Sequence, residues 1–176
     1  SLMNVTAPFL VVPLTSEHDR SQFNCGSEPL NVYFQNQVTQ DIRRRVTACF
    51  IATAPDRRVA GYYTLASASL LLSDLPEPVR RILPRYPLIP AIRMGRLAVD
   101  LHFRGQGLGG ALLADALART LKSEIAAYAL IVDAKNDESA SFYLHHGMTA
   151  LPNQPMSLFL PLATAKNILG SQKKPP

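Results

Sequence analysis

A run of glycines spaced for close approach of a phosphate lies in the second half of the chain. Residues 104–110 read RGQGLGG, between the apolar segment RLAVD and the helix-forming segment ALLADALARTLK. Glycine keeps side chains out of the way, and the first amides of a helix carry no internal partner, so such a turn can hold a pyrophosphate. The alternative is a plain tight turn.

Two better-known phosphate motifs do not fit this run. No Lys-Ser or Lys-Thr pair follows its last glycine, which excludes a Walker loop. A dinucleotide-binding fold would place the turn in the first strand–helix unit, with an acidic residue about 20 residues later at a strand end.

Tyr143, in the segment ASFYLHHGM, is the candidate for acid chemistry. When an amine attacks a thioester, the departing sulfur needs a proton or a hydrogen bond, and a phenol can supply either. The alternative is a core aromatic, because FY pairs at helical spacing are often packing residues. His145 and His146 lie near the end of the same helix, where histidines complement the helix dipole, and we do not expect either to be the base. No acidic side chain is evident as that base, and a water chain would suffice.

These motifs resemble the GNAT superfamily of N-acetyltransferases. Arg104, Gly107 and Gly109 match its Arg/Gln-x-x-Gly-x-Gly/Ala signature. The later half of the family is matched by RLAVD, Asn136, Phe142, Tyr143 and Gly147. Within the superfamily the chain is most similar to the toxin acetyltransferases of bacterial toxin–antitoxin operons, through FNCGSEPLNVYF, VAGYYTLA, GRLAVD and ASFYLHHGM.

The resemblance implies a mixed α/β fold, of the α+β kind, in which a central, mostly antiparallel, twisted sheet is flanked by helices. It also implies transfer of an acetyl group from acetyl-CoA to an amine. For the toxin branch that amine is the α-amino group of an aminoacyl-tRNA, whose acetylation blocks translation. The implied partners are a small DNA-binding antitoxin and a second copy of the chain in a homodimer.

The resemblance assigns roles to particular residues. Tyr143 becomes the catalytic residue that acts on the leaving sulfur. The backbone of Leu97, Ala98 and Val99 is expected to pair with the pantetheine arm like an added strand. Asn136 either bonds the coenzyme arm or caps the following helix. The turn residues expected to bind the coenzyme phosphates are Arg104, Gly105, Gln106, Gly107, Leu108, Gly109 and Gly110.

Two other functions remain open on the sequence. One is acetylation of a small amine or a protein N-terminus, although an arginine excess argues against a cationic acceptor. The other is a catalytically silent domain that binds acyl-CoA or RNA, against which the intact glycine turn and Tyr143 argue.

The positive charge is concentrated in one segment. The net charge is +5, whereas residues 43–104 hold 11 arginines against 4 acidic residues, or +7. Guanidinium groups match phosphate oxygens, so this segment is expected to contact RNA, although a solvated face is the alternative. The candidate RNA-binding residues are Arg43, Arg44, Arg45, Arg80, Arg81 and Arg85.

Length and composition predict one cytoplasmic enzyme domain. The 176 residues, 47% of them hydrophobic, suit a single domain over residues 3–165 with a basic tail over 166–176. No apolar run reaches the roughly 18 residues of a membrane span. Cys25 and Cys49 have neither metal-site spacing nor the number of a disulfide framework, so we expect no metal and reduced thiols.

Hydrophobic periodicity predicts the elements that position these residues. A helical stretch through Gln40 should bury Leu30, Phe34 and Val38 on one face. The expected strands are Phe9–Leu14, Val46–Thr53, Val59–Leu72, Ala91–Asp100, Ala127–Asp133 and Ser157–Leu162, and the other expected helices are Pro76–Leu83, Ala111–Lys122 and Asn136–His146.

Overall fold

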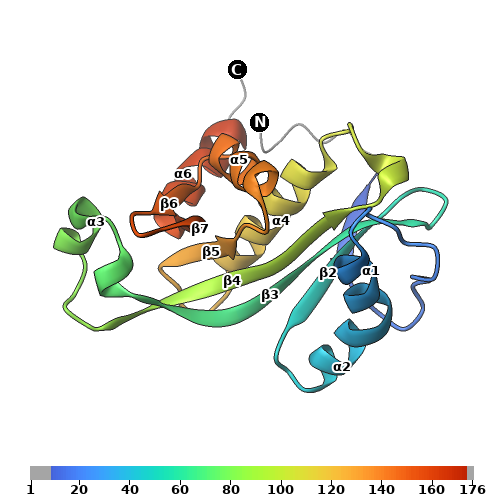
Figure 1. The fold of residues 1–176 in the computed structure, drawn as a ribbon, viewed down its shortest axis with the longest axis horizontal. Helices are drawn as coiled ribbons and strands as arrows, with labels where there is room; N and C mark the ends of the chain where they lie inside the picture. The colour runs from blue at the N-terminus through green and yellow to red at the C-terminus, as the bar shows by residue number, and fades with distance from the viewer. Residues whose placement is uncertain (1–8, 174–176) are drawn as a thin grey trace. The chain divides into compact units, whose positions relative to one another are not determined.

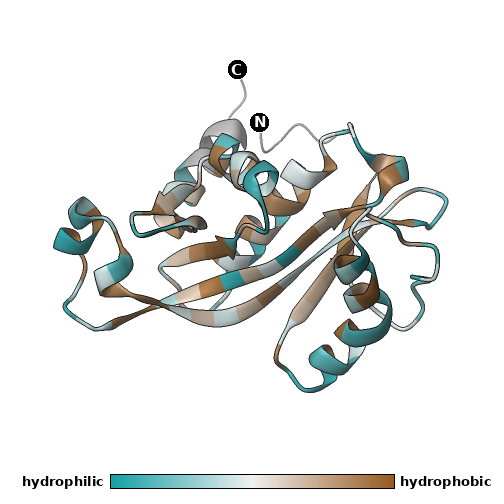
Figure 2. Cartoon of the chain, viewed as in Figure 1, coloured by the Kyte–Doolittle hydropathy of each residue, from teal (hydrophilic) through white to brown (hydrophobic). Residues whose placement is uncertain are grey.

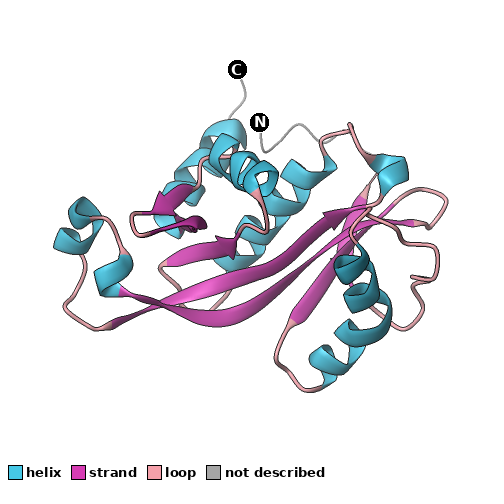
Figure 3. Cartoon of the chain, in the orientation of Figure 1, coloured by secondary structure: helices cyan, strands magenta, loops and turns pink. Residues whose placement is uncertain are grey.

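The computed structural model describes residues 9–173, which form a mixture of strands and helices (Figures 1 and 3). The strands are β1 (Leu10–Pro13), β2 (Ala48–Thr53), β3 (Val59–Leu71), β4 (Leu88–Val99), β5 (Ala129–Asp133), β6 (Thr149–Leu151) and β7 (Gln154–Pro161). The α-helices are α1 (Glu28–Val32), α2 (Val38–Arg43), α3 (Glu77–Ile82), α4 (Leu108–Lys122), α5 (Asp137–His145) and α6 (Leu162–Lys173). Three short helices complete the list, the π-helix η1 (Tyr33–Gln37) and the 3-10 helices η2 (Leu72–Asp74) and η3 (Leu101–Phe103).

The strands form a sheet in the order β1-β2-β3-β4-β5-β7-β6. Of the pairs with a resolved register, β1–β2, β2–β3, β5–β7 and β6–β7 are antiparallel and β4–β5 is parallel. This confirms the predicted mixed α/β class with a mostly antiparallel sheet and flanking helices. Among the residues that the structure describes, no helix has the length and apolar character needed to cross a membrane.

The chain folds as two compact units. The first contains the residues up to Ala66 together with Met94–Ala116, and the second contains Ser67–Arg93 together with the residues from Leu117 onward. The glycine turn belongs to the first unit. Tyr143 belongs to the second.

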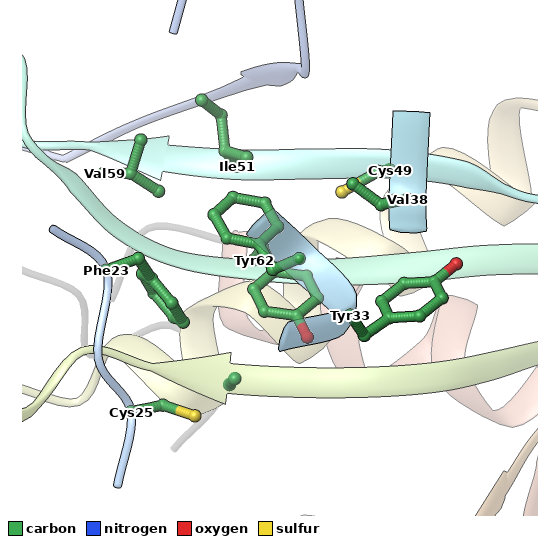
Figure 4. Close-up of a cluster of buried hydrophobic side chains, with 10 residues drawn as sticks. Phe23, Cys25, Tyr33, Val38, Cys49, Ile51, Val59 and Tyr62 are labelled. Carbon is green, nitrogen blue, oxygen red and sulfur yellow. The ribbon is translucent and has the colours of Figure 1, made fainter. Parts of the chain in front are cut away.

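In the first unit, a helical layer packs on β2 and β3. Phe34 and Val38 are fully buried and Leu30 packs against the same cluster, which confirms the predicted helical face. The rings of Phe34 and Tyr62 stack with centroids 4.1 Å apart, and Figure 4 shows Tyr62 amid this cluster. The sequence did not predict that the middle of the helical stretch widens into the π-helix η1.

Gly61 of β3 lets α4 approach the sheet closely. A Cβ atom at this position would lie 2.9 Å from both the Ala98 carbonyl oxygen and a methyl group of Leu112. The Leu112 methyl group could move aside, but the Ala98 carbonyl belongs to the backbone, so a side chain here would force β3 away from β4.

In the second unit, the apolar strand β5 (ALIVD) has buried residues at every position except the exposed Asp133, and it appears brown in Figure 2. It pairs with β7, which α5 and α6 also contact. The strand β6 and the helix α6 were not predicted. Residues 166–173, expected to lie in a tail, instead continue α6.

Candidate active site

The glycine turn has the geometry of an anion cradle. Gly105 and Gly107 adopt φ of +78° and +76°, a left-handed conformation that other residues adopt at a cost. The first helical hydrogen bond of α4 runs from the Ala111 amide to the Gly107 carbonyl at 3.2 Å. The amides of Leu108, Gly109 and Gly110 precede it, as the unsatisfied amides of a helix start do. The strand–turn–helix context predicted from sequence is confirmed, and these amides fit a pyrophosphate.

The turn is also open above the backbone. A Cβ atom at Gly105 would meet no heavy atom within 4 Å, and Gly107 is exposed. Space for a ligand therefore adjoins the backbone at the residues where the sequence predicted coenzyme phosphates. Gln106 is exposed on the same turn.

Arg104 is bonded to the protein itself. Its Nη2 atom donates to the carbonyl oxygen of Cys25, 2.5 Å away. One edge of the guanidinium therefore ties the glycine turn to the segment before α1, and within residues 9–173 its other nitrogen atoms make no hydrogen bond. Cys25 is buried, as a packing residue would be.

A buried carboxylate that caps the short helix η3 also joins the same two segments, a link that the sequence did not predict. Asp100, only 4% exposed, accepts hydrogen bonds from the backbone amides of Asn24 and His102 at 2.9 and 2.8 Å and from the His102 ring at 2.9 Å. Burial raises the pKa of Asp100, but these hydrogen bonds outweigh it and the net pKa lies below the usual value. The Asn24 side chain in turn accepts from Asn31 Nδ2 at 3.0 Å.

The two asparagines of the segment FNCGSEPLN are the sequence feature that indicates an ordered loop before α1. An asparagine pair flanking a turn commonly bonds its own backbone. Here Asn24 and Asn31 do so, through the amides of Gly26 and Cys25, both at 2.9 Å. Sequence alone could not place this loop against Asp100, which lies 76 residues from Asn24.

At the end of β4, the backbone groups of successive residues point alternately toward β3 and toward the opposite edge of the strand. Its parallel ladder with β5 covers Ala91–Arg93, so Met94–Val99 extend beyond that ladder. The Asp100 amide donates to Ala60 of β3, and strand backbone groups alternate in direction. Ala98 therefore directs its backbone toward β3, while Leu97 and Val99 direct theirs to the opposite edge. Of the three predicted residues, Leu97 and Val99 have the orientation that an added strand requires.

In the second unit, Asn136 caps α5. Its Oδ1 atom accepts from the Ser139 amide at 2.8 Å, which is the capping role that the sequence left open. Its Nδ2 group remains as the part of the side chain that could contact a coenzyme arm.

Tyr143 lies on α5 with its ring buried and 8% of the residue exposed. Burial raises the pKa of its phenol to about 12. In the described part of the chain no hydrogen bond engages its hydroxyl, whereas the buried Tyr62 and Tyr33 hydroxyls are bonded to Leu30 and Asp41. The phenol is thus protonated at neutral pH and can act as a donor.

The neighbouring histidines end the same helix. His145 lies in its last turn and His146 is the C-cap residue. Burial first, and the nearby His145 second, lower the pKa of His146. Within residues 9–173 no three His, Cys, Asp or Glu side chains are grouped so that they could hold a metal ion.

The candidate RNA-binding arginines form two sets in different units. Arg43, Arg44 and Arg45 are exposed at the end of α2. Arg80 and Arg81 lie on α3, where Arg80 donates to the Leu75 carbonyl at 2.8 Å and Arg81 pairs with Glu77 at 2.9 Å. Arg85 follows α3 and is exposed.

Comparison with known proteins identifies relatives over most of the chain. The acetyltransferase (GNAT) domain model matches residues 47–148. A tRNA-acetylating toxin of Mycobacterium tuberculosis is 34% identical over 89% of this chain and 94% of its own length. The probable toxin TacT of Sinorhizobium fredii is 29% identical over 92% of this chain and 95% of its own length.

Solved structures agree with these matches. A Tyr-to-Phe mutant of KacT superposes with a TM-score of 0.84 and 25% identity, covering 91% of this chain and 98% of that one. AtaT complexed with acetyl-methionyl-tRNAfMet superposes with a TM-score of 0.82 and 28% identity, covering 92% of this chain and 99% of that one. A mutant AtaT toxin bound to acetyl-CoA and the C-terminus of the antitoxin AtaR superposes with a TM-score of 0.75 and 26% identity. The match covers 93% of this chain and 99% of that one.

Proposed function

Because the chain belongs to the GNAT acetyltransferase family, we propose that it transfers an acetyl group from acetyl-CoA to the α-amino group of an aminoacyl-tRNA. The observation that carries this proposal is the 34% identity, over 89% of the chain, to a tRNA-acetylating toxin. The similarity to AtaT complexed with acetyl-methionyl-tRNAfMet supports the same acceptor. Acetylation of that amino group would block translation, so the chain acts as a toxin.

The coenzyme supplies the acetyl group as an activated thioester. The amides of Leu108, Gly109 and Gly110 bind its pyrophosphate, aided by the positive end of the α4 dipole and by the open space beside Gly105 and Gly107. Gln106 and the free edge of Arg104 lie beside this cradle. The backbones of Leu97 and Val99 bind the pantetheine arm, and an amide there polarises the acetyl carbonyl.

Tyr143 assists the departure of the sulfur. The acceptor nitrogen forms a bond to the acetyl carbonyl carbon, and the carbon–sulfur bond breaks as electrons return from the carbonyl oxygen. The Tyr143 hydroxyl donates a hydrogen bond or its proton to the thiolate, and the nitrogen loses a proton to water. A phenol with a pKa raised to about 12 remains protonated for this task at neutral pH.

The exposed arginines at the end of α2 supply charge for the tRNA backbone. Arg43, Arg44 and Arg45 make no hydrogen bond or ion pair through their side chains within the described residues, which leaves their charges available to phosphates. Arg80 and Arg81 already have protein partners and contribute less, and Arg85 is exposed beyond α3.

We further propose a small DNA-binding antitoxin as partner, a homodimer as the assembly and the cytoplasm as the compartment. An antitoxin is supported by the AtaT–AtaR complex, and the cytoplasm by the location of charged tRNA.

One assay separates this function from its rivals. The protein is incubated with labelled acetyl-CoA and a panel of charged tRNAs, polyamines and peptides. Label on an aminoacyl-tRNA supports the proposal. Label on a polyamine or a peptide N-terminus alone would indicate a small-amine or protein acetyltransferase, and no label on any acceptor would indicate a silent binding domain.

A further inference from the structure

A guanidinium lies over an aromatic ring in the first unit. The Cζ atom of Arg96, on β4, is 3.3 Å from the centroid of the Tyr33 ring. Tyr33 itself is buried, and Figure 4 shows its hydroxyl directed away from the other labelled side chains. Arg96 is half-buried. The ring therefore covers one side of the cation at a cation–π distance.

The ring is fixed from its far end. The Tyr33 hydroxyl donates to Asp41 Oδ2 at 2.7 Å, and Gln37 Nε2 donates to the other carboxylate oxygen at 3.2 Å. These bonds join the start of η1 to α2 and set the plane on which Arg96 rests. The ring over which the guanidinium lies is thus held by the protein itself.

Arg96 interacts electrostatically with Asp41 but forms no ion pair with it. Its charge is felt by Tyr33, Asp41, Cys49 and Tyr62, yet within residues 9–173 its side chain makes no ion pair or hydrogen bond. No buried side-chain nitrogen of the described residues lacks a hydrogen-bond partner, so the unused donors of the half-buried Arg96 are in contact with solvent, where a phosphate can reach them.

A second arginine of the same unit provides the contrast. Arg58 also lies over a ring, that of Phe103, with its Cζ atom 4.8 Å from the centroid. However, its Nε atom donates to Asp56 at 2.7 Å, so its charge is paired within the protein. Stacking alone therefore does not distinguish the two residues, and the availability of donors does.

We propose that Arg96, which lies over the Tyr33 ring, binds a phosphate of the acceptor end of the tRNA. This inference rests on the proposed function, because that function supplies the nucleic acid. The fork of an arginine matches two phosphate oxygens, and such charge-assisted pairs are the strong ones. Arg96 directly precedes the Leu97–Val99 segment, so a phosphate bound there would hold the acceptor end beside the residues assigned to the acetyl carrier.

The test measures binding rather than turnover. The full-length protein is titrated with one deacylated tRNA, chosen because wild type acetylates its charged form, over about 50 to 200 mM salt. Acetyl-CoA and dephospho-coenzyme A are titrated in parallel, because the coenzyme also carries phosphates. The variants are Arg96→Ala, Arg96→Lys and the matched control Arg58→Ala, each checked for folding by circular dichroism.

We expect Arg96→Ala to weaken tRNA binding about 10- to 100-fold. It should also reduce the slope of log affinity against log salt by about 0.7, the value for one single-strand phosphate. Arg96→Lys should keep the slope but bind more weakly, and Arg58→Ala should match wild type. Coenzyme affinity should be unchanged throughout.

Two results would overturn the inference. One is an unchanged tRNA affinity and slope in folded Arg96→Ala. The other is weaker binding of acetyl-CoA with unaltered tRNA binding, which would assign the phosphate to the coenzyme. Failure of wild type to acetylate any charged tRNA is a separate result that would reject the proposed function itself.

Discussion

Arg104, the arginine of the glycine-turn signature, donates from Nη2 to the carbonyl oxygen of Cys25, 2.5 Å away and 79 residues earlier in the chain. Asp100 makes a parallel link through the Asn24 amide at 2.9 Å. The loop before α1 and the turn before α4 are therefore held together by two side chains of the β4–α4 connection. Arg104 therefore stabilises the fold, in addition to the phosphate binding that we expect of it.

Because Arg104 links these two segments, we expect its substitution to destabilise the protein even without bound coenzyme. Arg104→Gln shortens the side chain and removes the bond to Cys25, so the free energy of unfolding should fall by about 1 kcal/mol. Urea denaturation of the coenzyme-free protein measures this free energy. Arg104→Lys keeps the charge without the fork and should lose a similar amount. If both variants are as stable as wild type, the tether contributes nothing.

The cradle is best tested at Gly109, because that residue lies inside α4. Gly109 lies in the first turn of α4 and has no positive φ, so Gly109→Val adds no backbone strain there while its side chain obstructs the amides of the turn. Acetyl-CoA at about 100 times its dissociation constant stabilises a folded protein by roughly 2.7 kcal/mol. That rise in melting temperature should be present in wild type and lost in Gly109→Val.

Gly107→Val is the companion variant. It should also lose the coenzyme-dependent shift, but its positive φ adds a strain of roughly 1–2 kcal/mol, which lowers the melting temperature of the free protein. A full shift in both variants would show that the turn does not hold the coenzyme.

The residues around the turn were predictable because local pattern determines them. Gly105 and Gly107 stand where the chain needs positive φ, and the periodicity of ALLADALARTLK gives α4. The helical face of Phe34 and Val38 followed from spacing alone. Each of these features is decided within a few residues, so a sequence pattern is sufficient.

The long-range links were not predictable for the opposite reason. Whether Arg104 meets Cys25, or Arg96 meets Tyr33, depends on how distant segments pack. The strand β6 has only three residues, too few for alternation to register. The helix α6 was missed because its weakly amphipathic sequence, interrupted by Gly170, resembles a polar tail.

The exposed arginines of α2 predict a salt effect on tRNA binding. Arg45 has a φ of +59°, so the triple variant Arg43→Gln, Arg44→Gln, Arg45→Asn removes the charges without straining that position. Each lost phosphate contact should reduce the salt slope by about 1 while leaving acetyl-CoA affinity alone. Arg81→Gln, which breaks an exposed pair with Glu77, should have a smaller effect. An unchanged slope in the triple variant would assign these arginines to solubility.

The raised pKa of Tyr143 predicts the pH dependence of acetyl transfer. An ordinary tyrosine ionises near pH 10, whereas the phenol of Tyr143 stays protonated until about pH 12. The single-turnover rate should rise as the acceptor amine loses its proton near pH 8 and remain level through pH 10. A rate that declines with a midpoint near 10 would mean that the catalytic acid is an unperturbed tyrosine or another group.

Tyr143→Phe separates the catalytic role of the hydroxyl from the packing role of the ring. The substitution keeps the buried ring on α5 but removes the group that donates to sulfur. The single-turnover rate should fall about 10²- to 10⁴-fold, the usual contribution of a positioned acid. Acetyl-CoA affinity should change little, because backbone groups of the turn and of β4 hold the coenzyme. The melting temperature should also stay close to wild type, since within the described residues the hydroxyl makes no hydrogen bond that the variant would lose. Phe142→Leu, which alters the adjacent aromatic and keeps Tyr143, is the matched control and should retain most of the rate. If Tyr143→Phe transfers acetyl within a few-fold of wild type, the thiolate must take its proton from water or from the acceptor amine.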